Sequence, residues 1–102
     1  MSTSQVEIEI PSALSVEFGQ DHFDVHLSDG RSLKTPVSWF PRLFHGSDSE
    51  RKNWRLIGGG TGIHWEDLDE DVSTEGLILG KKSMESPRSL AQWLAGRRGQ
   101  PE

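Results

Sequence analysis

Five carboxylates lie within six positions, directly after Trp65. They are Glu66, Asp67, Asp69, Glu70 and Asp71. A calcium loop that began at Asp67 would need glycine at its sixth position and glutamate at its twelfth, where the chain has Val72 and Ile78. No metal site of that type is predicted, although weak binding of a divalent ion stays open. Because an acidic cluster steers a basic protein toward it, we predict that this segment binds a partner protein.

Two further features resemble parts of nucleotide or catalytic sites. A phosphate-binding loop needs lysine and serine or threonine directly after its glycines, but Ile63-His64 follows the glycine-rich run 58–62. We expect these glycines to provide positive-φ backbone, or a bend packed closely on another segment. His64 lies near Glu66, and a carboxylate can orient an imidazole for acid–base catalysis, yet no motif places a nucleophile beside it. We therefore predict no enzyme and no cofactor.

Basic residues concentrate in the C-terminal tail. They are Lys81, Lys82, Arg88, Arg97 and Arg98. The chain as a whole has a formal net charge of −5, which argues against general nucleic-acid binding because contacts with phosphates need a basic face. The tail keeps an alternative open, in which these five residues serve nucleic-acid binding or transcriptional regulation in an accessory role.

Length and composition limit the class of protein. The 102 residues form one domain, and only 32% of them are hydrophobic, so a partner or a second copy could support folding of the small core. The absence of cysteine excludes disulfides and thiol catalysis. No apolar stretch approaches the roughly 20 residues that span a bilayer, and the N-terminus lacks the features of a signal peptide. We expect a cytoplasmic protein.

The apolar pattern predicts an α+β fold that begins with an antiparallel β-meander. Residues 14–18 and 23–27 alternate between apolar and polar side chains, the pattern of half-buried strands, with Leu14 on the apolar side. Asp29-Gly30 predicts a type I′ turn into a third strand over 31–37.

Short helices and a glycine-rich strand pair are expected to follow the meander. The expected elements are a helix over 38–46, a capped turn of helix over 47–54, strands over 55–57 and 62–65, a helix over 74–79 and a C-terminal amphipathic helix over 87–97. Ser47 and Glu50 match a capping box, and Pro87 suits the first position of a helix. We thus predict a flexible leader over 1–11, a single α+β domain over 12–80, and a linker plus C-terminal helix and tail over 81–102.

Aromatic residues add a second candidate surface. Trp39, Phe40, Leu43 and Phe44 form one apolar stripe if residues 38–46 are helical. The four tryptophans of the chain are mostly expected in the core, but one or two at the surface would mark an interface, since tryptophan is enriched at binding hot spots. The predicted partner-binding set therefore includes Trp39, Phe40, Arg42 and Trp65 beside the five carboxylates.

Three segments of the chain resemble a small bacterial domain-of-unknown-function family. They are 37–43 (VSWFPRL), 50–60 (ERKNWRLIGGG) and 62–73 (GIHWEDLDEDVS), followed by Glu75-Gly76-Leu77. Members of that family are short α+β proteins, often encoded beside a second small protein, so the resemblance implies an antitoxin-like role in a type II toxin–antitoxin module. Other members carry an appended helix-turn-helix domain, for which residues 81–102 are too few. The resemblance assigns no catalytic residues.

The sequence therefore predicts a non-enzymatic protein-binding module without a metal or cofactor. Its predicted partner is a small basic, toxin-like protein encoded by the neighbouring gene. The alternative is the nucleic-acid accessory role of the basic C-terminal helix, and a homodimer also stays open. No membrane association is expected.

Overall fold

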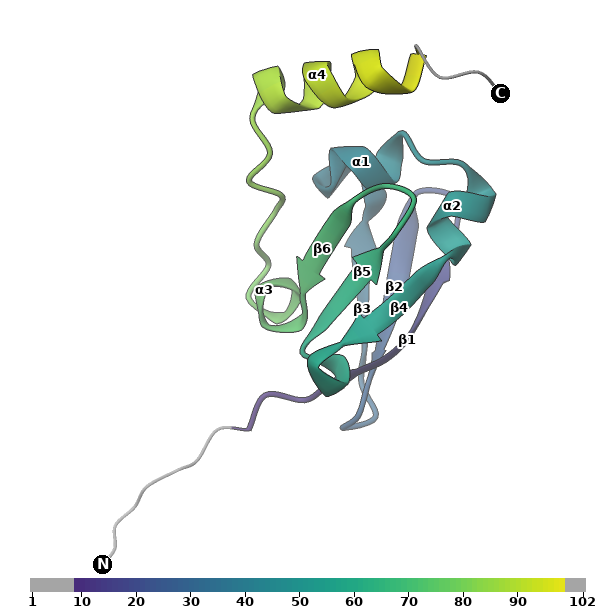
Figure 1. Ribbon diagram of the computed structural model, residues 1–102. Helices are drawn as coiled ribbons and strands as arrows, with labels where there is room; N and C mark the ends of the chain where they lie inside the picture. Colours follow the sequence, from purple (N-terminus) through teal and green to yellow (C-terminus); the bar gives the residue numbers. More distant parts are fainter. Residues whose placement is uncertain (1–8, 99–102) are drawn as a thin grey trace, which may run out of the picture.

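The computed structural model describes residues 9–98 and contains two antiparallel sheets of three strands each (Figure 1). In chain order the elements are β1 Ala13–Phe18, β2 His22–Leu27, β3 Ser32–Pro36, the 3-10 turn η1 Val37–Trp39, α1 Pro41–Phe44, α2 Asp48–Lys52, β4 Trp54–Ile57, the 3-10 turn η2 Gly58–Gly60, β5 Gly62–Trp65, β6 Glu70–Ser73, α3 Thr74–Ile78 and α4 Pro87–Arg98. The strand orders are β1-β2-β3 and β4-β5-β6. The predicted α+β class with its β-meander is confirmed. The leader predicted over 1–11 lies mostly outside the described residues.

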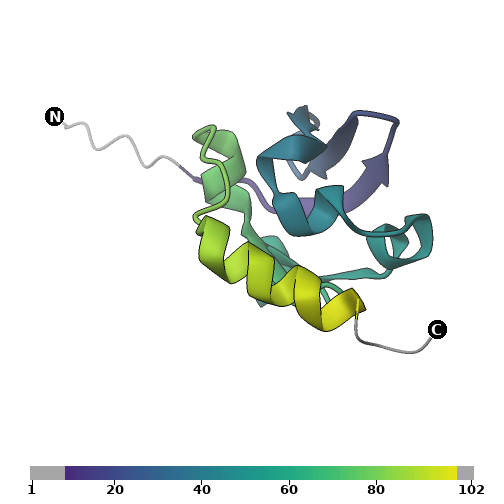
Figure 2. The ribbon, with the colours of Figure 1, turned by 90° about the horizontal axis from the view of Figure 1, so that it is seen from above.

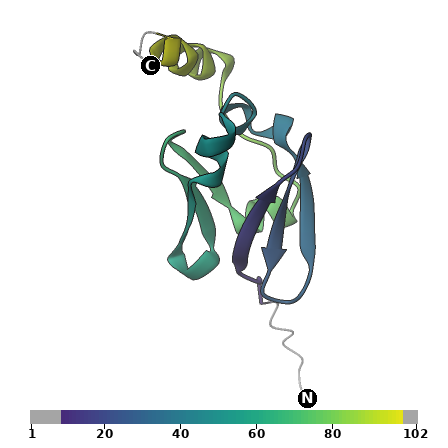
Figure 3. The same cartoon turned by 90° about the vertical axis from the view of Figure 1, so that its right-hand side faces the viewer.

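The two sheets form two layers that face each other (Figure 3), with the core between them. The ring of Phe23 on β2 meets that of Trp65 on β5 edge-on, with 6.3 Å between their centroids. On one side β1 lies beside β4, and on the other α3 contacts both β3 and β6. Helix α4 crosses one end of the molecule, as the view from above shows (Figure 2). None of the helices within residues 9–98 has the length and apolar character needed to cross a membrane.

Two details of the meander differ from the prediction. The β1–β2 register shifts between Ala13 and Ser15, which turns Ala13 into the core and leaves Leu14 exposed. In the β2–β3 hairpin, Gly30 has a φ of 92° whereas Asp29 lies outside the positive-φ region. A type I′ turn needs positive φ at both central residues, so that turn type was wrong. The loop closes instead through a hydrogen bond of 3.1 Å from the N–H of Gly30 to the Leu27 carbonyl.

The helix expected over 38–46 is broken into η1 and α1. Proline disfavours helical backbone at the residue before it, and Phe40 accordingly has an extended φ of −127° and ψ of 92°. Pro41 is the first residue of α1, not its third as a cap at Ser38 would require. The expected stripe also divides, since Phe40 and Leu43 are buried but Phe44 is exposed.

The glycine-rich strand pair is confirmed as β4 and β5, but the acidic segment adds an unpredicted third strand, β6. Val72 is the one buried side chain of β6, so its short sequence lacks a strong alternating pattern. Helix α3 begins at Thr74 with Ser73 as its cap, as expected, and ends at Ile78. Leu79, predicted on the buried side of that helix, is exposed.

The glycines of η2 have the backbone that was predicted for them. Gly58, Gly59 and Gly60 have φ of 59°, 67° and 101°. A Cβ on Gly60 would lie 2.5 Å from the Ala13 carbonyl oxygen, so glycine lets the second sheet approach the start of β1. The capping box of Ser47 and Glu50 is confirmed on α2.

Candidate partner-binding site

The β5–β6 hairpin presents most of the predicted acidic cluster to solvent. Glu66, Asp67 and Asp69 lie in its loop and are exposed, as is Asp71 on β6. The side chain of Asp69 is 85% exposed, and its Oδ2 lies 3.7 Å from Arg42 Nη1. The carboxylates lie close to a few bases only, such as Arg55, whose Nη2 is 3.7 Å from Glu66 Oε1. The hairpin is therefore an acidic surface.

The loop that carries these carboxylates is anchored to the core of the protein. Leu68 at its centre is fully buried and packs so close to Gly46 that a Cβ there would lie 2.8 Å from Leu68 Cδ1. Arg42 donates a hydrogen bond of 3.2 Å from Nη1 to the Asp69 carbonyl. Asn53 Nδ2 donates to Asp67 Oδ2 at 3.0 Å. The backbone of the acidic loop is thus anchored to the protein, and its carboxylates are presented from a fixed position.

His64 lies on the outer face of the second sheet between two of these acids. Its Nδ1 is 2.6 Å from Asp71 Oδ1, and its Nε2 is 3.4 Å from Glu66 Oε1. Within residues 9–98, both polar partners of the His64 ring are carboxylates, so no serine or threonine hydroxyl is paired with this imidazole. Within residues 9–98 no group of three or more His, Asp or Glu side chains is arranged to hold a metal ion.

The outer face of the first sheet carries a similar row. His26 Nε2 lies 2.6 Å from Glu17 Oε1, and His26 Nδ1 lies 2.7 Å from Ser32 Oγ. Because cross-strand neighbours on the exposed face of a sheet commonly pair in this way, both histidine rows are accounted for as contacts that hold strands in register.

Two of the predicted partner-binding residues are in the core, so their prediction was wrong. Trp65 has 0% of its surface exposed, and its indole N–H donates to the Arg51 carbonyl at 2.9 Å. Phe40 is buried as well. Trp39 is half-buried at the edge of the protein, with the Lys82 ammonium 5.2 Å from its ring centroid. Large rings in a small domain are drawn into the core, where they bury the most apolar surface.

Arg42 has a structural role that the sequence did not indicate. It forms two hydrogen bonds of 2.8 Å to the carboxylate of Glu85, which lies between α3 and α4. These bonds lower the pKa of Glu85. The guanidinium also lies over the ring of Trp93 on α4, at 5.1 Å. No local pattern marks Glu85 as a partner, because the two residues are far apart in the chain.

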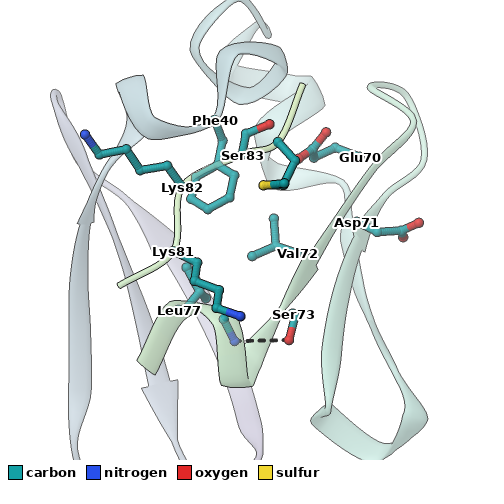
Figure 4. Close-up of a pocket in the computed structure, with 11 residues that line it drawn as sticks. Phe40, Glu70, Asp71, Val72, Ser73, Leu77, Lys81, Lys82 and Ser83 are labelled. Atoms are coloured by element: carbon teal, nitrogen blue, oxygen red, sulfur yellow. Dashed lines mark hydrogen bonds between the residues drawn. The ribbon is translucent and has the colours of Figure 1, made fainter. Parts of the chain in front are cut away.

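Glu70 is separated from the other acids of the cluster. Its side chain lies on the inner face of β6 with Val72 and lines a cavity of about 290 Å³ (Figure 4). Burial, reinforced by the nearby charge of Glu85, raises the pKa of Glu70 to about 7. Glu70 is therefore a carboxyl group that titrates near neutral pH. The sequence-based prediction had placed it with the other carboxylates on the solvated surface.

The basic residues of the tail do not form one surface. Arg97 makes two hydrogen bonds, of 2.9 and 3.1 Å, to the Glu50 carboxylate on α2, which neutralises its charge. Lys82 lies over Trp39, Lys81 lines the Ser73 end of the cavity, and Arg88 is exposed. Arg98 is the last residue of α4, and its side chain lies outside the part described. The structure therefore brings Arg97 onto the protein body and leaves Lys81, Lys82 and Arg88 separate.

Comparisons with known proteins identify a family and two similar structures. A family model described as "Protein of unknown function (DUF2442)" matches residues 13–83. A protein of unknown function from Rhodospirillum rubrum has a similar structure, with a TM-score of 0.65 and 28% identity over 74% of this chain and 93% of that one. An uncharacterised protein from Chromobacterium violaceum shares the fold, with a TM-score of 0.63 and 23% identity over 79% of this chain and 74% of that one. No curated protein matches the sequence.

Proposed function

The chain belongs to the DUF2442 family of proteins of unknown function, and we propose that it is a non-enzymatic module that binds a small basic protein. The observation that carries the proposal is the anchored acidic hairpin, in which Glu66, Asp67 and Asp69 are exposed while Leu68 between them is buried. An anchored acidic loop favours one complementary partner, because its backbone need not be reordered on binding.

As a protein-binding module, the chain would act in the manner of an antitoxin. It would hold a small basic toxin-like protein encoded by the neighbouring gene, with the acidic hairpin facing the basic surface of that protein. The small size of the domain supports this role, since a bound partner stabilises the folded state in proportion to its concentration and affinity.

Co-expression with the product of the neighbouring gene tests the proposal directly. We expect the two proteins to copurify as one species in size-exclusion chromatography. Association should slow as salt is raised from about 50 mM to 500 mM, because screening shortens the reach of surface charges to a few ångströms. Two proteins that elute separately at low salt would overturn the antitoxin-like role.

Neutralising the charges of the acidic hairpin tests whether this hairpin is the surface that binds the partner. The variant E66Q/D67N/D69N keeps side-chain shape, and Asn tolerates the positive φ of 50° at Asp69. We expect it to weaken the complex about tenfold or more. The matched control E9Q/D21N/E75Q removes the same amount of charge from exposed positions outside the hairpin. An equal loss in both variants would show that net charge, not the hairpin, attracts the partner.

A further inference from the structure

The cavity beside β6 has an apolar floor and polar ends. Phe40, Val72 and Leu77 supply apolar surface, and all three are buried residues of the core. One wall is β6, and the opposite wall is the segment 81–86 that connects α3 to α4, here named the strap. The strap is held to η1 by a hydrogen bond of 3.0 Å from the Ser83 N–H to the Trp39 carbonyl. Figure 4 shows the space between these two walls.

The backbone of β6 is open on the side of the cavity. β6 is the last strand of its sheet, and Thr74 N–H bonds to the Thr61 carbonyl at 3.0 Å. Backbone groups of an antiparallel strand point alternately toward and away from its neighbour. With Thr74 pointing toward β5, Asp71 must direct its N–H and C=O groups, and Ser73 its N–H group, to the free edge, while the Ser73 carbonyl caps α3. Both residues line the cavity.

Glu70 supplies charge at one end of this cavity. Its carboxyl group has no ion-pair or hydrogen-bond partner within residues 9–98, whereas neighbouring Glu85 is bound to Arg42 and Ser89. The two lysines of the rim do not neutralise it. Lys82 directs its ammonium to the Trp39 ring, and Lys81 lies at the Ser73 end of the cavity, away from Glu70 (Figure 4).

We propose that this cavity binds a lysine or arginine side chain carried by an extended segment of the partner protein. The segment would pair with the open edge of β6 through Asp71 and Ser73, as added strands do. The aliphatic part of its basic side chain would cover Phe40, Val72 and Leu77, and the cationic end would meet Glu70. The proposal rests on the proposed function and specifies how the basic partner is recognised.

The absence of cysteine from the chain makes a tethering experiment specific. Met84 lines the cavity and is 96% exposed, so Met84→Cys places one thiol at its rim. The probes are three acetylated tripeptide amides, Cys-Gly-Lys, Cys-Gly-Glu and Cys-Gly-norleucine, at equal concentration in a thiol buffer. Mass spectrometry measures the fraction of protein in mixed disulfide. Leu14→Cys, at an exposed position on β1, is the control for general attraction of cations to an acidic protein.

We expect Met84→Cys to capture the lysine probe about tenfold more than the norleucine probe, because an ion pair in a part-buried site adds to apolar contact. The preference should disappear in Met84→Cys with Glu70→Gln, and be much smaller at Leu14→Cys. Equal capture of the two probes, or a preference that survives Glu70→Gln or recurs at Leu14→Cys, would overturn the proposal. The purified chain alone is used, so failure here leaves the copurification test of the proposed function standing.

Discussion

Arg42 and Glu85 lie 43 positions apart in the chain and form a bidentate ion pair, in which both hydrogen bonds are 2.8 Å long. Glu85 is largely shielded from water, with 8% of its side chain exposed. The same guanidinium holds the acidic hairpin through the Leu68 and Asp69 carbonyls and lies over Trp93. Arg42 thus connects the acidic hairpin, the strap and α4.

Arg42→Ala should destabilise the protein by about 3 kcal/mol, because it leaves a shielded carboxylate without its partner. Urea unfolding at pH 7 measures the loss. In a double-mutant cycle, Arg42→Ala with Glu85→Ala should cost less than the sum of the single changes. Arg55→Ala is the control: its ion pair with Glu66 is exposed, and its loss should stay within about 0.5 kcal/mol. Equal losses for Arg42→Ala and Arg55→Ala would refute the role assigned to Arg42.

Glu70→Gln should stabilise the protein above neutral pH and leave it unchanged in acid. Burial and the negative charges of Glu85, Asp71 and Asp69 raise the pKa of Glu70 to about 7, against the opposing effect of Arg42.

The folded state therefore holds this proton more tightly than the unfolded state does, and the contribution of Glu70 to stability falls as pH rises from about 4.5 to 7. At pH 8 we expect Glu70→Gln to be more stable than the wild type by about 1–3 kcal/mol, with no difference at pH 4. Unfolding by urea at both pH values provides the measurement, and Glu75→Gln at an exposed position is the control. A variant less stable than the wild type at pH 8 would contradict the assignment.

Glu50 should show the opposite dependence on pH. The hydrogen bonds from Arg97 lower the pKa of Glu50 to about 2, so its contribution is present above the ordinary carboxyl pKa and is lost as pH falls toward 2. Glu50→Gln keeps the capping side chain and removes the charge, and we expect a loss of about 1 kcal/mol at pH 7.

Glu50→Ala also removes the half of the capping box in which the Ser47 N–H donates to the Glu50 carboxylate, and it should cost about 1 kcal/mol more. Thermal unfolding at pH 7 and pH 2 measures both variants, and Glu50→Gln should match the wild type at pH 2. If Glu50→Gln and the wild type differ as much at pH 2 as at pH 7, charge is not what this pair contributes.

Gly60→Ala should be among the most damaging single-methyl changes in the chain. The added Cβ would meet the backbone oxygen of Ala13 at 2.5 Å, and the φ of 101° disfavours any L side chain. We expect a loss of about 2–4 kcal/mol. Gly96→Ala adds the same methyl where nothing lies within 4 Å, and in helix α4 it should stabilise by up to about 1 kcal/mol. Urea unfolding of the two variants should therefore give changes of opposite sign.

The sequence predicted those elements whose signals are local. The alternation over 23–27, the capping box of α2, the positive-φ glycines and the proline start of α4 all depend on near neighbours, and the structure confirms them. β6 was missed because Val72 is its one buried residue, so its strand form depends on pairing with β5. Trp65 was placed at the surface beside its acidic neighbours, yet the pleat turns it into the core.

The candidate site divides in the same way. The acidity of the β5–β6 loop is readable from its composition, but the separation of Glu70 from the other carboxylates depends on which face of β6 it occupies. The pairing of Arg42 with Glu85 and of Arg97 with Glu50 requires the path of the strap and α4 over the protein body. Such contacts between distant segments leave no pattern in the sequence.

The arrangement of the two sheets determines the order in which the chain can fold. Each sheet contains consecutive strands, over 13–36 and 54–73, so its pairing closes short loops only and is kinetically favoured. The facing rings of Phe23 and Trp65 belong to different sheets. During synthesis the first meander emerges before the second, so its apolar face around Phe23 stays exposed to solvent until the second meander has been made. We therefore expect docking of the two meanders, rather than strand pairing, to be the step that sets the folding rate.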